Sequence, residues 1–401
     1  MDIKYEAMMV LSAFADCLSF SIITNSENYF EDIFVKNYKY YNNEKLYKFI
    51  ELGGINGINL ENSFVSDITL YNIATAESML KYKGKLNNNF LKICFQNISN
   101  SFSTILEDFN QKNKKNNKDR ISNYEIYKIL SFNNHPDNNK NFDEFNLSYK
   151  LLINSSNPST KSLIIGSCLF GKKNRNELID VTIRISQITD NSPLGFLGGL
   201  TTSLFTAFSL ENISIKKWPF ELLKILKSNY IRMKIDKDDF NMNRDYHMYI
   251  NYWTKYIDIK FENNSNNITN NLAIRIHNYY HNFNDKPFAG IKDDYLKFLS
   301  NRSKIISGKI EYNDDIDLGS SSFCCNIMAY DCLLDCQGNW EKLIIYSSLF
   351  IGKSNNVGSI ASGLYGIHYG YGDVNKKILK NLEFLNKLKN LSKKIYIKYN
   401  N

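Results

Sequence analysis

Apolar residues recur along most of this chain at helical spacing. In residues 66–80 they follow the 3.6-residue period of a helix, at Leu70, Ile73, Ala74 and Leu80. Similar patterns predict helices over 7–20, 159–170, 176–188, 195–210, 340–349 and 376–399. They also predict several helices within 215–256, and a Ser-rich loop followed by a helix within 318–336. The alternation with a period of two that would indicate strands is scarce. The pattern therefore predicts an all-α fold.

Polar and glycine-rich stretches mark where these helices begin and end. Ser66 or Asp67 suits a helix N-cap, and Pro193 separates one predicted helix from the next. A Gly-rich turn is predicted at 52–54. Residues 110–145 are rich in Asn and Lys, and we interpret them as a solvated insertion rather than a linker. The expected organisation is a single domain over 1–401.

The stretch 352–369, GKSNNVGSIASGLYGIHY, predicts a tight turn that opens into a helix of small residues. Small side chains let a second helix approach closely, so we expect this helix to be central. A turn that delivers polar residues to a helix N-terminus is also a place where ions and phosphates are held.

One acid, Asp16, lies within the apolar helix predicted at 7–20. A buried carboxylate is costly unless it is paired or caps a neighbouring helix, so one of these two roles is expected.

Composition indicates which partners and which cellular compartment to expect for the protein. The 401 residues are 43% hydrophobic, and the net charge of +8 favours a solvated surface over a nucleic-acid partner. Seven cysteines without CxxC pairs, and a start without signal-peptide shape, predict a reduced, cytoplasmic protein. The apolar run 195–210 is short for a membrane span, and no membrane partner is expected.

The five histidines carry no catalytic signature. His277 and His281 are four residues apart, which suits a metal-binding helix face, but no acid or cysteine of suitable spacing accompanies them. We therefore interpret them as a surface pair.

The order of six segments resembles the ADP-ribosylglycohydrolase family, and most closely its ADP-ribosylarginine hydrolase branch. The resemblance covers nearly the whole chain. The segments are AMMVLSAFADCL at 7–18, LGGINGINL at 52–60, VSDITLYNIATAESML at 65–80, ITDNSPLGFLGGLTTSLFTAF at 188–208, GSSSFCCNIMAYD at 319–331 and GKSNNVGSIASGLYG at 352–366.

This resemblance implies an orthogonal helical bundle around two magnesium ions, and cleavage of the bond between ADP-ribose and a side chain, arginine in this branch. Hard divalent cations take oxygen ligands, so two close ions need several carboxylates. The family supplies them from a Ser/Thr-Asp-Asp-Thr turn and a later Gly-Asp-Ser-Asp turn.

This chain departs from both turns. The hydroxyl and first acid fall on Ser66 and Asp67, but the second acid falls on Ile68. In the later turn the two acids fall on Lys353 and Asn355. A positive charge repels a divalent ion, so no ordinary dinuclear site and no cofactor are expected.

Two further family patterns are altered. A His-Asp pair after the Ser-rich loop falls on Phe323 and Cys324. Two histidines common in the branch fall on Asp190 and Ser192.

The resemblance also implies where ADP-ribose would lie and which acid would assist. The residues that fall at ligand-binding positions are Ser155, Ser156, Asn157, Lys161, Gly195, Ser320, Ser321 and Ser322. Backbone amides and hydroxyls there can hold phosphate without metal. Glu27 falls near the family's acid after the first helix, and Asp67 is the remaining acid of the metal turn.

Three hypotheses follow: a pseudoenzyme that acts by binding or scaffolding, a binder of ADP-ribose or ADP-ribosylated protein without turnover, and a working ADP-ribosylarginine hydrolase with an altered magnesium site. The main expectation is a catalytically degraded member in which Lys353 replaces a metal's charge by pairing with Asp67. Any protein partner is unidentified by the sequence.

Overall fold

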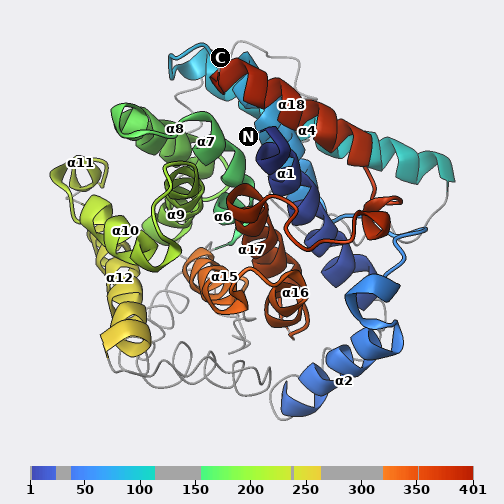
Figure 1. Ribbon diagram of the computed structural model, residues 1–401. Helices are drawn as coiled ribbons and strands as arrows, with labels where there is room; N and C mark the ends of the chain where they lie inside the picture. The colour runs from blue at the N-terminus through green and yellow to red at the C-terminus, as the bar shows by residue number, and fades with distance from the viewer. Residues whose placement is uncertain are drawn as a thin grey trace, which may run out of the picture.

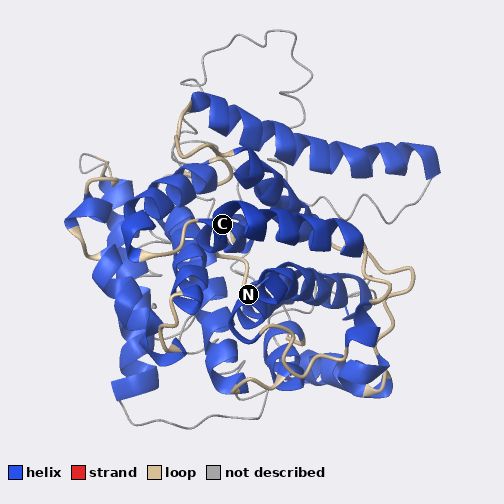
Figure 2. Cartoon of the chain, turned by 45° about the horizontal axis from the view of Figure 1, so that its top comes forward, coloured by secondary structure: helices blue, strands red, loops and turns tan. Residues whose placement is uncertain are grey.

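The computed structural model describes residues 2–23, 38–112, 155–235, 239–262, 319–350 and 352–400. Across these ranges the chain is helical and contains no strand, and one isolated antiparallel bridge joins Ser155 to Ser321. The prediction of an all-α fold is confirmed (Figure 2).

The helices form a bundle, with α17 and α1 near its middle and α18 along one edge (Figure 1). Their bounds are α1 Asp2–Cys17, α2 Tyr38–Glu51, α3 Asp67–Lys81, α4 Asn88–Lys112, α6 Asn157–Lys161, α7 Leu163–Cys168, α8 Arg175–Gln187, α9 Pro193–Leu210, α10 Trp218–Leu226, α11 Asn229–Arg232, α12 Phe240–Ile257, α15 Ser322–Cys336, α16 Trp340–Ser348, α17 Ser354–Tyr369 and α18 Leu385–Asn400.

The helix of small residues, α17, lies at the centre and packs along α1 (Figure 1). A Cβ added to Gly366 would lie 2.5 Å from the carbonyl carbon of Ala7 and from the backbone nitrogen of Met8. Seven residues earlier on α17, the hydroxyl of Ser359 shares a hydrogen bond of 2.7 Å with the hydroxyl of Ser12 on α1. The expected close approach of a second helix is therefore present, and α1 is that helix.

The second central helix is α9, whose 18 residues are all buried. Within the described ranges two helical stretches, Asp2–Ile22 and Pro193–Leu210, are long and apolar enough to cross a membrane. Their most apolar windows are 83% and 100% buried, as expected for core helices that pack on their neighbours.

Several predicted helices are present but divided differently. The first α-helix ends at Cys17 and continues as a π-helical turn, Leu18–Ile23. The helix predicted over 159–170 is two short helices, α6 and α7. The tail splits into a 3₁₀ turn, Lys376–Leu379, and α18, because Phe384 adopts a left-handed φ of 60° between them.

Two sequence predictions lie largely or wholly outside the described residues. Most of the predicted polar insertion at 110–145 lies outside them, and so does the pair His277 and His281.

The contact between α1 and α17 generates a stability prediction. Gly366→Ala should lower the free energy of unfolding by about 1–3 kcal/mol, because the new methyl group meets backbone atoms that cannot rotate away. Gly363→Ala is the matched control, since its methyl group would meet the flexible end of Leu163. Urea unfolding checks both, and equal losses for the two variants would contradict the close backbone contact.

Candidate functional site

The site is built around the N-terminus of α3, which Asp16 of α1 holds in place. Asp16 is fully buried. One carboxylate oxygen accepts a 2.5 Å hydrogen bond from the Ser66 hydroxyl, and the other accepts from the Ser66 amide at 3.0 Å and the Thr69 hydroxyl at 2.7 Å. The Thr69 amide donates as well, at 3.3 Å. Asp16 therefore caps a neighbouring helix, one of the two roles expected from the sequence.

Ser66 is the N-cap of α3. Its hydroxyl oxygen accepts a hydrogen bond from the amide of Ile68 at 3.2 Å. Burial raises the pKa of the Asp16 carboxyl, and the four hydrogen bonds from Ser66 and Thr69 oppose that rise. The first turn of α3 is thus fixed by a carboxylate that lies on another helix.

Asp67, the first residue of α3, is partly exposed at the surface of the site. Burial and the nearby charge of Asp16 raise its pKa to about 7, and the charge of Lys353 opposes that rise. Ile68 follows it with its side chain 1% exposed, packed in the interior. The turn therefore offers one carboxylate, whose pKa lies well above the ordinary value of an aspartate.

The turn before α17 meets the start of α3. The side-chain amide nitrogen of Asn355 donates a hydrogen bond of 3.4 Å to the Ser66 hydroxyl oxygen. Lys353 is exposed, and its charge acts on Asp67 through space, but no ion pair joins the two side chains in the described part of the chain. The prediction that these positions lie near each other agrees with this charge effect, whereas the predicted direct ion pair is not formed between these two described residues.

A second link runs from α17 to the predicted ligand loops. The side-chain amide nitrogen of Asn356 donates hydrogen bonds to the Ser156 hydroxyl oxygen and to the Gly319 carbonyl oxygen, the latter at 3.3 Å. The Ser156 amide in turn donates to the carbonyl oxygen of Ser320 at 2.8 Å. The two serine-rich loops and the α17 turn therefore form one connected structure.

Two hydroxyls in these loops have no hydrogen-bond partner. Ser155 and Ser321 face each other across the isolated bridge, and each side-chain oxygen is buried and unpaired within the described residues. Ser321 is also the N-cap residue of α15, but its side chain makes no capping bond. By contrast, the Ser322 hydroxyl donates to the Ser155 carbonyl oxygen at 2.7 Å. Unpaired buried hydroxyls are costly, and a bound polar ligand is one way to satisfy them.

Two predicted ligand residues lie under the loops rather than on their open side. Lys161 is 0% exposed, and its ammonium donates a 2.7 Å hydrogen bond to the Thr189 hydroxyl. A Cβ on Gly195 would lie 2.3 Å from the carboxyl carbon of Asp190. Both residues are enclosed by protein in this structure, and their predicted contact with a ligand stays a prediction.

Sequence reasoning missed the role of Asp190. Its carboxylate oxygens accept hydrogen bonds from the amides of Ser155, at 2.9 Å, and Ser192, at 3.2 Å. Asp190 thereby connects the first ligand loop to the start of α9. The signal available was an acid two residues before Ser192, which is the N-cap of that helix and is followed by Pro193 at its first position.

Two aromatic rings also meet beside the serine-rich loop. The rings of Phe323 and Tyr252 stack with centroids 4.0 Å apart and an interplanar angle of 6°. Phe323 is the second residue of α15, so this contact joins the start of α15 to α12.

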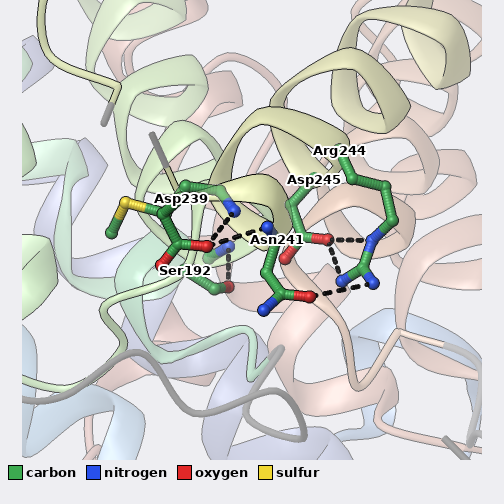
Figure 3. A network of polar contacts seen from close by, with 7 residues as sticks. Ser192, Asp239, Asn241, Arg244 and Asp245 are labelled. Carbon is green, nitrogen blue, oxygen red and sulfur yellow. Dashed lines mark hydrogen bonds and ion pairs between the residues drawn. The ribbon is translucent and has the colours of Figure 1, made fainter. Parts of the chain in front are cut away.

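The starts of α9 and α12 carry a further set of polar contacts (Figure 3). Ser192 caps α9 by accepting from the Gly195 amide at 3.2 Å, and Asp239 caps α12. The Arg244 guanidinium donates twice to one oxygen of the buried Asp245, at 2.6 and 3.0 Å, and once to Asn241 at 3.3 Å. These contacts fix the arginine on α12.

The remaining expectations concern metal and the second acid. Glu27 lies outside the described residues. Among those that are described, no group of three or more His, Cys, Asp or Glu side chains is arranged to hold a metal ion. All seven cysteines are buried and free of disulfides.

Comparison with known proteins identifies relatives that are similar to this chain in sequence. No protein-family model matches the chain. It is 30% identical to an ADP-ribosyl glycohydrolase of Acanthamoeba polyphaga mimivirus over 369 residues, 88% of this chain and 62% of the relative. It is 26% identical to the ADP-ribosylhydrolase ARH1 of Dictyostelium discoideum over 247 residues, 59% of each protein. The chain thus spans about three-fifths of the length of these relatives.

A solved structure titled ADP-ribosylglycohydrolase-related protein complex is similar with a TM-score of 0.48 and 11% identity, over 98% of both chains.

The raised pKa of Asp67 predicts a pH-dependent stability. An aspartate normally ionises near pH 3.8, so ionising Asp67 in the fold at about pH 7 costs stability as the pH rises from about 4 to above 7. Asp67→Asn removes this cost, and its advantage over the natural protein should grow between pH 5 and pH 8 by about 1–3 kcal/mol. Melting temperatures across that range check it.

Lys353→Gln provides the complementary variant. It removes the charge that lowers the pKa of Asp67, so the carboxyl should titrate at a higher pH than in the natural protein. Carbon-13 NMR of the aspartate carboxyls measures this. An advantage of Asp67→Asn that stays flat with pH, or an unchanged midpoint in Lys353→Gln, would contradict the electrostatic description.

Proposed function

Because the chain is a member of the ADP-ribosylglycohydrolase family, we propose that it is an ADP-ribosylhydrolase-like protein that binds ADP-ribose or ADP-ribosylated protein without a dinuclear magnesium centre. In this proposal it is a pseudoenzyme, and its activity is recognition.

The donor set argues against two magnesium ions. A pair of Mg²⁺ ions needs several oxygen ligands with negative charge. At the two turns, Asp67 supplies one carboxylate and Asn355 a neutral amide, whereas Ile68 is a buried hydrocarbon. Lys353 adds a positive charge close enough to act on Asp67. Asp16 is occupied by its four hydrogen bonds to the start of α3. The residues present do not fit the family's metal pair.

The unpaired hydroxyls of Ser155 and Ser321 carry the binding part of the proposal. They lie on two adjacent loops, and Ser321 stands at the N-terminus of the 15-residue helix α15. Helix N-termini and hydroxyl donors together suit the oxygens of a phosphate or a ribose. A ligand of the ADP-ribose type would satisfy both hydroxyls, and no metal is required for these contacts.

A second candidate function is an active ADP-ribosylarginine hydrolase with an altered metal site. It is favoured by Asp67, which keeps a carboxylate beside Ser66 and Asn355. A carboxyl with a pKa near 7 suits general acid–base work at neutral pH. A single Mg²⁺ is the cofactor of this alternative.

Calorimetry with ADP-ribose tests the binding proposal. ADP-ribose should bind, and adding magnesium should leave the affinity unchanged. Ser321→Ala should weaken binding about tenfold, the equivalent of one hydrogen bond of about 1.4 kcal/mol. Ser101→Ala is the matched control, because the Ser101 hydroxyl on α4 is also buried and unpaired but belongs to a different helix. An absence of binding would overturn this proposal.

Turnover of ADP-ribosylated arginine tests the alternative. The pseudoenzyme proposal predicts no release of ADP-ribose with or without magnesium. Release that depends on magnesium and disappears in Asp67→Ala would establish the hydrolase instead.

A further inference from the structure

Most of the net positive charge of the chain comes from its last helical segment. Residues 376–400, here called the basic segment, contain eight lysines and one acid, Glu383. They carry +7 of the whole chain's net charge of +8. The rest of the sequence is close to neutral, so the average charge conceals a local excess.

All eight lysines of the basic segment are exposed. Figure 1 shows α18, in red, along the outer edge of the bundle. Four of the lysines, Lys377, Lys380, Lys393 and Lys394, form no ion pair with any residue that the structure describes. Two others have acidic neighbours, with Lys387 at 2.9 Å from Glu77 and Lys389 at 3.8 Å from Glu6. The excess charge is therefore only partly compensated within the molecule.

The lysines of α18 are arranged in two rows. The buried side of this helix consists of Leu388, Leu391, Ser392 and Ile395. At about 100° per residue, Lys389 and Lys393 fall on one flank of the exposed side, and Lys387 and Lys394 on the other. Asn386, Asn390 and Ile397 lie between the rows. The exposed side is a polar strip bordered by cations.

The two rows match the spacing of a duplex groove. On a helix about 10–12 Å wide, the rows stand about 10 Å apart. The major groove of B-DNA is about 12 Å wide and has phosphates on both edges. The strip between the rows contains two asparagines and one exposed apolar side chain, Ile397. A hydrated groove accommodates such a strip, whereas insertion into a lipid surface needs an apolar centre between the lysines.

We propose that the basic segment is a docking surface for double-stranded DNA, which it binds through backbone phosphates without reading the sequence. This inference is independent of ADP-ribose binding. The sequence-level expectation of no nucleic-acid partner rested on the modest net charge and on the scattering of Lys and Arg among Asp and Glu along the chain. It did not consider how the lysines of α18 are arranged on the surface of the folded helix.

The test is fluorescence anisotropy of a labelled DNA duplex at several salt concentrations, using the full chain. The natural protein should bind in the micromolar range at low salt, with affinity that falls steeply as salt rises. The quadruple variant Lys377→Gln, Lys380→Gln, Lys393→Gln, Lys394→Gln should bind at least tenfold more weakly, with a salt slope smaller by about 3–4.

The matched control removes the same charge elsewhere. Lys172, Lys173, Lys216 and Lys217 are also exposed, and changing all four to Gln lowers the net charge by the same amount. This variant should retain DNA affinity within about twofold. Both variants should keep the melting temperature and the ADP-ribose affinity of the natural protein, which separates this test from the proposed function.

Other outcomes would overturn the docking proposal. These are no DNA binding by the natural protein, equal losses in the two quadruple variants, or tighter binding to phosphatidylserine vesicles or polyglutamate than to DNA at equal charge concentration. An RNA duplex should bind more weakly than DNA, because the deep and narrow major groove of A-form RNA does not admit a helix. Equal or tighter RNA binding would likewise contradict the groove geometry.

Discussion

The close contact between α1 and α17 is the constraint on which the site depends. Gly366 allows the backbones to touch at Ala7 and Met8, and the Ser12–Ser359 hydrogen bond joins the helices farther along. Because α17 carries the turn at 353–356 and α1 carries Asp16, their fixed alignment sets where both parts of the site can lie. The hydrogen bond from Asn355 to Ser66 then joins the start of α17 to the start of α3.

Burial of charge explains why two acids of the same region behave differently. Asp16 is enclosed, but hydrogen-bond donors from Ser66 and Thr69 surround both of its oxygens. Its cost of burial is offset by capping α3. Asp67 has fewer donors, and the neighbouring negative charge raises its pKa further. A divalent ion would normally relieve such crowding of acids. Here the positive charge of Lys353 opposes the rise in the pKa of Asp67.

Local rules allowed much of this to be predicted from the sequence. The Ser66 cap, the capping role of Asp16 and the helix starts near Pro193 and Trp340 depend on a few adjacent residues and on the cost of burying a charge. The enclosure of Lys161 could not be predicted, because it depends on Thr189, which lies 28 residues farther along the chain. The enclosure of Gly195 depends on how the turn after α8 places Asp190 against it, which the residue pattern alone does not give. Resemblance placed these residues near the ligand loops, but it could not show which side of the loop faces solvent.

Helix polarity relates the site to the basic segment. The N-terminus of a helix favours negative groups and its C-terminus favours cations. On α3 the N-terminal end has Asp16 and Asp67, whereas the last carbonyls accept hydrogen bonds from Lys398, at 3.0 Å for Met79 and 2.8 Å for Leu80. Helix α3 is about 22 Å long at 1.5 Å per residue, so the acids at its start and Lys398 are held at opposite ends of this helix.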